Sequence, residues 1–405
     1  MNSYRLDIIL VFLSLFLLAV ALSGKEEWLI RDVTVTPRRS LNGKVDITYW
    51  LDCQNPEEKS VARIAAHGWD CVRNQPVPMK TLTGDGIKTP VPPGGPYHIV
   101  WDTSRDAPNL NTAAFVATPY VLHDYLVIDL KRGRYEFRDN GPDLSDDTCR
   151  TTELWLRYIP NGTFRMGAPQ DEQGRDYDET QHTVTLTQSY WIGIFEVSQK
   201  QYELITGNNP SFYKGDTRPV ECVSYSDIRG LNTGLMWPSG GHAVDADSFL
   251  GKLRAKTGLD FDLPTEAQWE YACRAHTTTS LNSGKKLAAV KQCPNMAEVG
   301  RYHYNRADGK GGYGEHTKVG SYFPNHWGLY DMHGNVGELC LDWWQNYSSV
   351  AAIDPLGGET GMYRVRRGGY WDGNPTDCRS ANRDTSGPTR INDSIYGFRL
   401  VCPAP

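Results

Sequence analysis

The sequence of 405 residues lacks three features that define common functional classes. It has no cluster of lysine and arginine beyond short pairs, and its formal net charge is -6, so it lacks the basic surface that nucleic acids require. It has no Cys-x-x-Cys pair and no close Cys and His cluster, so a structural zinc site has no support. After the first 23 residues no apolar run is long enough to span a membrane. We therefore expect no nucleic-acid partner and no later membrane segment.

The one long apolar run lies near the N-terminus. Residues 8–22, IILVFLSLFLLAVAL, precede an abruptly polar stretch, with Ala19 and Ala21 in a small-x-small pattern. This pattern predicts a signal peptide over residues 1–23, cleaved after Ala21 or Ser23. An uncleaved anchor is the alternative, but the run is short for a span of about 20 residues. The mature chain is expected to be secreted or periplasmic, with no membrane contact after cleavage.

Nine cysteines in an exported chain predict disulfide bonds, although the odd number leaves at least one thiol unpaired. The 39 glycines and 24 prolines indicate many loops, and 12 Trp and 22 Tyr supply apolar area for large cores. A loop-rich body of this kind is usually stabilised by disulfides or bound cations. The cysteines stand at positions 53, 71, 149, 222, 273, 293, 340, 378 and 402.

The region from residue 24 to 130 has the pattern of short strands separated by turns. KVDITYWLD places Val45, Ile47, Tyr49 and Leu51 on one face and polar residues on the other, which is the period of a half-buried strand. Turn-rich segments such as TPVPPGGP follow. This predicts a small all-β sandwich that acts as an accessory domain. Residues 131–150 are charged, turn-prone and aperiodic, and we predict a linker there.

From residue 151 to 405 the pattern is mixed, with short strands, short helices and long loops, which indicates an α+β class. LPTEAQWEYACRA contains the clearest helix. Thr265 can cap this helix after a proline, and Gln268 stands three residues later, as in a capping box. Trp269, Ala272 and Cys273 then share one face.

Ten motifs of this second region occur in the order and approximate spacing of the formylglycine-generating enzyme (sulfatase-modifying factor) family. The region resembles this family from residue 152 to 402. The resemblance implies a compact fold with little regular secondary structure that is related to C-type lectins. The motifs are FRMG, HTVTL, IFEVSQKQY, NNPS, PVECVSYSD, LPTEAQWEYACRA, VGSYFPNHWGLYDMHGNVGE, RVRRGGYW, CRSANR and GFRLV.

The best-known members of the family oxidise a cysteine of a sulfatase to formylglycine with O2 and a copper ion held by two cysteines. Two thiolates suit Cu(I), which is a soft metal ion. Counted from Gly368 and Gly369, the first of these positions falls on Gly373 and the second on Cys378. One thiolate cannot form a two-coordinate copper site, so copper is not expected. A ligand from a distant loop is the alternative.

Alignment from the C-terminal side gives Cys378 a different role. It then falls near a family cysteine that forms a disulfide with the helix, and the helix partner corresponds to Cys273. The resemblance therefore implies a Cys273–Cys378 disulfide, which we favour over a catalytic Cys378. Two other departures stand near this position: Gly337 and Leu339 replace tryptophans, and Tyr370 replaces a small serine.

The resemblance also implies structural calcium. DMHGNVGE matches a family site with side-chain ligands Asp331 and Glu338 and backbone ligands Gly334 and Val336, and hard oxygen donors on a glycine-bearing turn suit Ca2+. A polar turn with capping acids is the alternative interpretation.

A second calcium site would use Asn295, the carbonyl of Met296, and Asp308. Here the spacing matches only loosely.

The residues thus predict an exported protein with a sulfatase-modifying-factor domain that lacks copper oxidase activity and serves as a binding or structural module. Its partner would be a peptide, a sulfatase or a glycan. The alternatives are an active O2-dependent oxidase of the formylglycine-generating type, a related metal-dependent oxidase, and a protein whose N-terminal domain does the binding.

Overall fold

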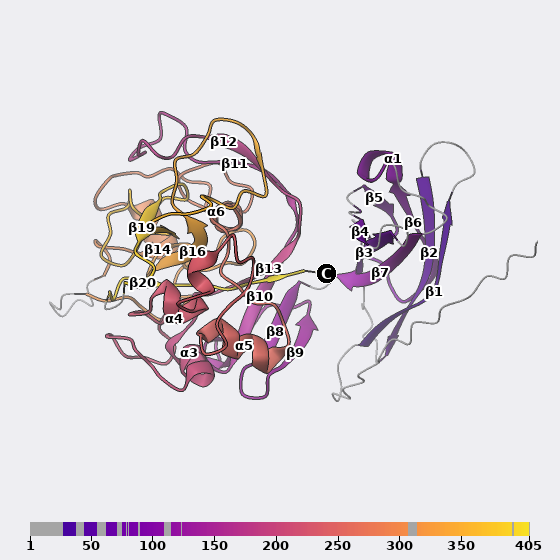
Figure 1. Cartoon of the computed structure of the whole chain (residues 1–405), viewed down its shortest axis with the longest axis horizontal. Helices are drawn as coiled ribbons and strands as arrows, with labels where there is room; N and C mark the ends of the chain where they lie inside the picture. The colour runs from indigo at the N-terminus through magenta and orange to yellow at the C-terminus, as the bar shows by residue number, and fades with distance from the viewer. Residues whose placement is uncertain are drawn as a thin grey trace, which may run out of the picture. The chain divides into compact units, whose positions relative to one another are not determined.

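The computed structural model describes residues 27–37, 44–54, 62–70, 75–77, 79, 81–87, 90–108, 115–122, 124–306, 314–390 and 393–404. The chain divides into two compact units, residues 1–122 and 123–405 (Figure 1). The predicted signal peptide over residues 1–23, and Asp308, lie outside the described residues. Within those residues, no helix combines the length and the apolar character that a membrane crossing needs.

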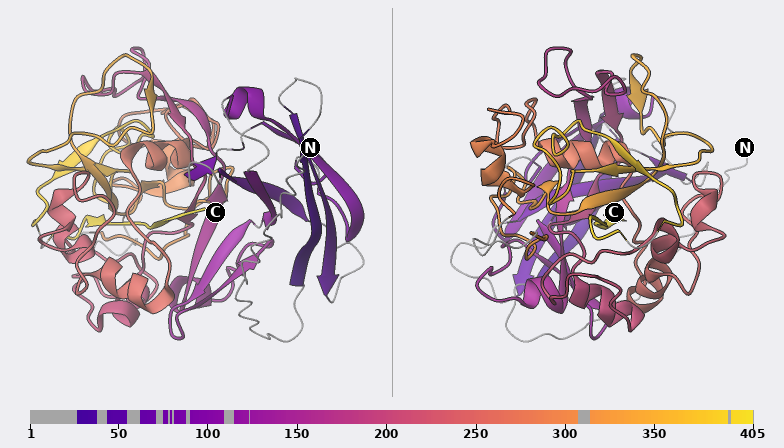
Figure 2. Two further views of the ribbon diagram at one scale, coloured as in Figure 1. Left: turned by 45° about the vertical axis from the view of Figure 1, so that its right-hand side comes forward. Right: turned by 90° about the vertical axis from the view of Figure 1, so that its left-hand side faces the viewer.

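The first unit carries two antiparallel sheets. One has the order β1 (Glu27–Pro37), β2 (Lys44–Gln54), β6 (Gly94–Asp102), β5 (Leu82–Gly84), and the other has the order β4 (Gln75–Val77), β3 (Arg63–Asp70), β7 (Phe115–Leu122). One helical turn, α1 (Thr103–Asp106), follows β6. The two views of Figure 2 show these strands in the indigo part of the chain.

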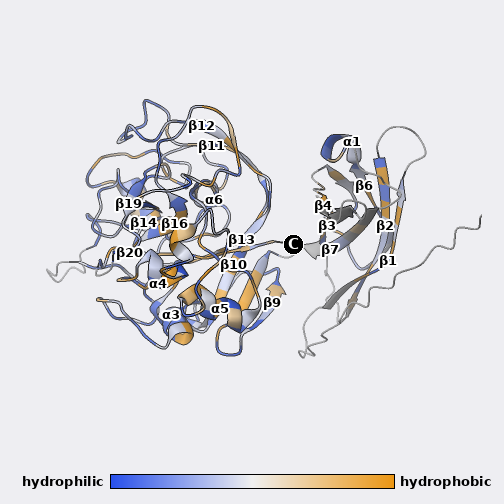
Figure 3. Ribbon diagram, in the orientation of Figure 1, coloured by the Kyte–Doolittle hydropathy of each residue, from blue (hydrophilic) through white to orange (hydrophobic). Residues whose placement is uncertain are grey.

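The predicted alternation along β2 is confirmed, because Val45, Ile47, Tyr49 and Leu51 are fully buried. The polar and apolar residues of this strand alternate in Figure 3. The four side chains form one cluster with Trp101 of β6 and with residues of the other sheet, namely Ile64, Val77 and Ala117. The two sheets of the first unit therefore share one apolar core.

The second unit begins earlier than the sequence indicates. Strands β8 (Tyr125–Asp129) and β9 (Arg134–Arg138) belong to its largest sheet, whose order is β21 (Val401–Pro403), β13 (Tyr190–Gly193), β10 (Glu153–Ile159), β8, β9. The predicted linker over residues 131–150 therefore holds a strand and a short helix, α2 (Thr148–Thr151). β9 is an edge strand with mostly exposed side chains. Tyr135 and Phe137 alternate with charged residues along it, but both rings are exposed.

The rest of the second unit has short elements joined by loops. Its small sheets are β11-β12-β17, β14-β15 and β19-β18-β16-β20. The strand bounds are β11 Gly162–Met166, β12 His182–Leu186, β14 Gly300–Arg301, β15 His333–Gly334, β16 Gly337–Trp343, β17 Ala352–Ile353, β18 Arg364–Arg367, β19 Asp384–Ser386 and β20 Tyr396–Gly397. The helices are α3 Gln199–Thr206, α4 Tyr225–Arg229, a 3-10 turn Gly234–Met236, α5 Phe249–Thr257, α6 Glu266–Arg274 and α7 Pro294–Val299.

The predicted capping box of α6 is confirmed. The Gln268 N–H donates to the Thr265 hydroxyl at 3.1 Å, and the Thr265 N–H donates to the Gln268 side-chain oxygen at 2.9 Å. The predicted face of Trp269, Ala272 and Cys273 is fully buried. The helix lies against β16 and β18, so its caps and its apolar face together position the residues of the candidate site.

Candidate functional site

The turn at residues 368–373 brings the predicted copper positions together. Gly368 and Gly369 have φ of 92° and 70°, a region that favours glycine. A Cβ on Gly369 would lie 2.6 Å from Cys378 Sγ and 2.7 Å from the carbonyl oxygen of Asp377. Only a glycine therefore allows the Cys378 segment to lie against the turn.

Gly373 closes this turn and carries no metal-binding group. It is buried, its N–H donates to the Tyr370 carbonyl at 2.9 Å, and its carbonyl accepts the His303 N–H at 3.0 Å. A Cβ added here would lie 3.2 Å from the Tyr370 oxygen and 3.5 Å from Asp377 Oδ2. The position thus has room for a small side chain, after a slight adjustment, but supplies no thiolate.

Cys378 lies in an apolar cluster and is fully buried. Its neighbours there include Cys293, Met296 and Tyr302, and its thiol lies 4.0 Å from the Tyr370 carbonyl oxygen. Burial, and then the charge of Asp377, hold the pKa of Cys378 well above its usual range. The side chain is therefore a protonated thiol at neutral pH, which is a poor metal ligand.

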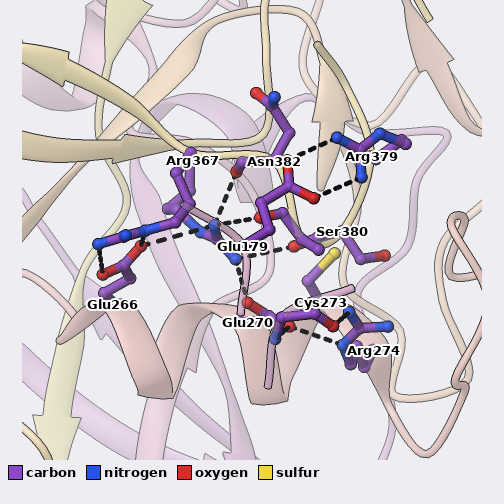
Figure 4. A network of polar contacts seen from close by, with 12 residues as sticks. Glu179, Glu266, Glu270, Cys273, Arg274, Arg367, Arg379, Ser380 and Asn382 are labelled. Atoms are coloured by element: carbon purple, nitrogen blue, oxygen red, sulfur yellow. Dashed lines mark hydrogen bonds and ion pairs between the residues drawn. The ribbon is translucent and has the colours of Figure 1, made fainter. Parts of the chain in front are cut away.

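The predicted Cys273–Cys378 disulfide is absent, because both residues are free thiols in the structure. Ser380, two residues after Cys378, forms the side-chain hydrogen bond with Cys273, and Figure 4 draws these two side chains close together. The Cys273 thiol also lies 3.9 Å from the Met332 carbonyl, and burial raises its pKa to about 12. The residue of the segment 378–380 that contacts Cys273 of α6 is therefore Ser380, and not Cys378 as predicted.

A second group of residues, to which the sequence assigned no site, lies at this turn. The ring Nδ1 of His303 lies 2.9 Å from Asp372 Oδ1, and Arg306 pairs with the same carboxylate. His303 and Asp372 are 41% and 43% exposed, and Arg306 lies over the Trp371 ring. Burial and the charge of Arg306 lower the pKa of His303. No spacing links residues about 70 positions apart, so only the fold reveals this pair.

The space left by Gly337 is filled by an aromatic ring. A Cβ on Gly337 would lie 3.0 Å from Cδ1 of Tyr396, which stands beside it in the paired strand β20. Tyr370 packs edge-on against Tyr396, with ring centroids 5.8 Å apart. Leu339 is buried in the core. Tyr396 therefore occupies the space beside Gly337, and Tyr370 packs on that ring.

The two carboxylates of the first predicted calcium turn have different environments. Glu338 is paired through both oxygens with Arg399, at 2.6 and 2.5 Å, and accepts the Trp269 indole N–H at 2.7 Å. Asp331 accepts the Gly320 N–H, while its other oxygen is buried without a partner. Of the two side chains, only Asp331 thus retains an oxygen for a cation. Gly334 and Val336 donate their N–H groups to Gly368 and to Glu196.

Three acids are buried together at this turn. Burial, and then Asp331 and Glu338, hold the pKa of Glu196 well above its usual range, and burial raises the pKa of Asp331 to about 6. In the part of the chain that the structure describes, no three His, Cys, Asp or Glu side chains are grouped as a metal site. Arg399 is paired with one of these three acids, Glu338.

The second predicted calcium site has its residues in helix α7. The Asn295 amide donates to the Lys286 carbonyl at 2.8 Å, and the Met296 carbonyl accepts the Gly300 N–H at the end of the helix. The Asn295 amide nitrogen and the Met296 carbonyl therefore have protein partners. The third residue, Asp308, lies outside the described residues.

The segment that follows Cys378 is fixed by buried ion pairs (Figure 4). Arg379 binds Glu179 and Glu172, and Arg383 binds Glu266 at 2.6 Å. Arg367 pairs with Glu270. Because removing one partner would leave the other charge buried, these pairs hold the segment in one conformation.

Comparisons with known proteins place the second unit in one family. A family model described as the sulfatase-modifying factor enzyme 1-like domain matches residues 143–404. The formylglycine-generating enzyme of Thermomonospora curvata is 36% identical over 252 residues, which cover 52% of this chain and 80% of that enzyme. The structure of PvdO from Pseudomonas aeruginosa aligns with a TM-score of 0.50 at 26% identity and covers 62% of this chain and 94% of PvdO.

A protein of a different name is also similar to this chain. The serine/threonine-protein kinase pkn1 of Chlamydia pneumoniae is 40% identical over 262 residues, which cover 62% of this chain and 38% of the kinase. The chain therefore spans little more than a third of that relative's length.

Proposed function

The chain belongs to the sulfatase-modifying factor enzyme 1-like family, and we propose that it is a member without copper oxidase activity that acts as a binding module. The observation that carries this proposal is the glycine at position 373. A small side chain has room there, yet the turn presents only backbone atoms. The second position, Cys378, is a buried thiol with a raised pKa.

The chemistry of Cu(I) supports this proposal. Soft thiolates select this ion, and the thiolate is the form that binds it. The residues around the turn instead offer a neutral thiol, an imidazole held by Asp372 and the rings of Trp371 and Tyr370. This set does not fit the two-thiolate site, and the remaining role is recognition by the scaffold.

The finer features of the protein belong to the same proposal. The second unit would be a C-type-lectin-related domain and the first an accessory β-sandwich. Export through a cleaved signal peptide would deliver the protein to the periplasm or outside the cell. The partner would be a peptide, a sulfatase or a glycan. The kinase name is not extended to this chain, because the match covers 38% of that protein.

Calcium is proposed at the Asp331 turn, with Asp331 as the side-chain ligand. The buried oxygen of Asp331 without a partner supports this proposal, as does the excess of carboxylates over Arg399. Glu338 is already paired with Arg399. Added Ca2+ should therefore raise the melting temperature of the native chain, and Asp331→Asn should abolish that increase while magnesium leaves both proteins unchanged.

The decisive experiment measures oxidase chemistry directly. The full chain, reconstituted with Cu(I), is incubated with O2 and a sulfatase-type cysteine peptide, and the peptide mass is followed. We expect no formylglycine and no stoichiometric Cu(I) binding. Formation of formylglycine by the native chain, together with its loss in Cys378→Ala, would overturn the proposal. If His303→Ala also lost it, His303 would be identified as the second copper ligand.

A further inference from the structure

A small cavity lies at the other end of β16 from the turn described above. Gly337, beside the turn, and Asp342, beside the cavity, are five residues apart on this strand, which is about 17 Å at the rise of a β-strand. The cavity has a volume of about 130 Å³ and lies among the start of α6, the end of β16 and the segment 345–357. It is therefore separate from the predicted copper position.

The walls of the cavity are mainly apolar and its size suits a short chain. Met166, Ala267, Ala352 and Pro355 contribute to the wall, and Val350, which is 70% exposed, also lines it. A cavity of about 150 Å³ holds one benzene molecule, so this cavity can take about five or six non-hydrogen atoms.

Two carboxyl groups line this space, and of these Glu266 is bound by Arg383. Asp342 lines the cavity, is 3% exposed, and accepts the Glu266 N–H through Oδ2 at 2.7 Å. A Cβ on Gly357 would lie 3.1 Å from its other oxygen, Oδ1, so the glycine keeps the space beside that oxygen open. Gly357 has φ of 71°, and any other residue would be strained there.

Asp342 has no ion-pair partner within the described residues, although arginines lie near it. Arg383 is paired with Glu266 and lies over the Tyr347 ring at 3.8 Å. Arg364 of β18 donates to backbone carbonyls and lies over Trp343. These two cations are thus engaged elsewhere.

Two further titratable groups complete the surroundings of Asp342. His182 of β12 and Glu266 of α6 also line the cavity. The His182 ring packs against Tyr347, with centroids 4.9 Å apart. Burial, and then Glu266, raise the pKa of Asp342 to about 8. Arg383 also lines the cavity, and the charges of Arg383 and Arg364 lower this pKa only in part. A further cation beside Asp342 would therefore stabilise the ionised carboxylate.

We propose that this cavity binds the primary ammonium group of an unbranched alkyl chain of about four carbons, as on a lysine side chain or a free alkylamine. The ammonium group pairs with the Asp342 carboxylate, and the methylenes contact the apolar wall. The inference rests on the proposed binding role of the protein and names the chemistry of one ligand.

The raised pKa of Asp342 sets the pH dependence of binding. An ammonium ion needs the ionised carboxylate, and Asp342 holds a proton below its raised pKa. Binding therefore releases a proton below pH 8 and weakens about tenfold for each pH unit below the pKa. Affinity becomes constant above pH 8, until the amine itself loses its proton near pH 10.

The test is calorimetric titration of the full chain with n-butylammonium between pH 6 and pH 9, in buffers of different ionisation enthalpy. We expect affinity to rise at least tenfold across this range, with proton release below pH 8. Asp342→Asn keeps an acceptor for the Glu266 N–H, and it should lose amine binding at least tenfold while still binding n-butanol. The control Asp247→Asn removes an exposed carboxylate and should behave as the native chain.

Two ligands separate the sources of the ammonium group. If Nα-acetyl-lysine methylamide binds as tightly as butylammonium, the natural ligand is a lysine side chain. If it binds more weakly, the natural ligand is a free alkylamine. Affinity that does not change with pH, or that survives Asp342→Asn, would overturn the inference. If Asp342→Asn fails to fold, proton release by the native chain decides alone. The oxidase assay is independent of every outcome here, so failure of one proposal is distinguishable from failure of the other.

Discussion

At the scale of single residues, burial determines what the two cysteines near the turn can do. Cys273 and Cys378 are inaccessible and their thiols have raised pKa values. We expect neither to react with iodoacetamide in the native protein at pH 8, because the reactive form is the thiolate. Both should react after unfolding in guanidinium without a reductant. A Cys273–Cys378 linked peptide in a non-reducing digest would contradict this.

Arg399 is the residue whose loss should be most costly at the Asp331 turn. Arg399→Met leaves Glu338 buried beside Glu196 and Asp331 without a positive charge, and breaking such a pair costs about 3–5 kcal/mol. Denaturant unfolding measures this loss. Arg132→Met is the matched control, since Arg132 is 73% exposed and pairs with Asp129, where the cost is at most about 1 kcal/mol. Equal effects of the two changes would refute the assignment.

Single residues also mark the limit of what the sequence could predict at the site. Gly373 and Cys378 follow from spacing within one segment, so the sequence alone locates them. His303 and Asp372 come from distant segments, and Ser380 is found beside Cys273 only once the backbone path after Cys378 is known. The ion-pair partner of Glu338, Arg399, is likewise 61 residues away. Contacts of this kind leave no local pattern.

At the scale of elements, the capping box of α6 is the clearest local sequence signal for secondary structure in the chain. Thr265→Ala removes the acceptor of the Gln268 N–H and should cost about 0.5–2 kcal/mol. Thr278→Ala, at an exposed loop position, should stay within about 0.5 kcal/mol. The free energy of unfolding of both variants checks the difference, and a loss in Thr278→Ala as large as that in Thr265→Ala would contradict the assignment.

The elements that sequence reasoning missed are the short and exposed ones. β2 is predictable because one of its faces is buried and the period of two is visible. α6 is predictable from its capping box, although eight of its nine residues are buried. β9 is an exposed strand at the edge of its sheet that pairs with β8, its neighbour in sequence, and its aromatic rings stay exposed. Strands of two residues, such as β14 and β20, are too short to show any period.

At the scale of the whole molecule, the two units have separate cores. We therefore expect two unfolding transitions in calorimetry. Ile47→Ala in the first core should lower one transition and Leu253→Ala in the second should lower the other, each by about 2–5 kcal/mol. Both residues are fully buried, so the pair is matched. A shift of both transitions by either change would show that the two units unfold as one.

The molecule as a whole also shows that the family resemblance predicts the fold but not the activity. The order of ten motifs identifies the family of the second unit, and its fold neighbours agree. The motifs do not reveal the activity, because Gly373, Gly337 and Tyr370 stand where the resemblance implies a cysteine, a tryptophan and a serine. The function of this chain therefore depends on what its own side chains can bind.

The oxidation of a sulfatase-type cysteine peptide by the full chain, with Cu(I) and O2, tests the proposed loss of oxidase chemistry most directly. The absence of the first thiolate predicts that the peptide mass stays unchanged and that Cu(I) is not retained at one ion per chain. Conversion of the cysteine to formylglycine, lost when Cys378 is replaced by alanine, would contradict it.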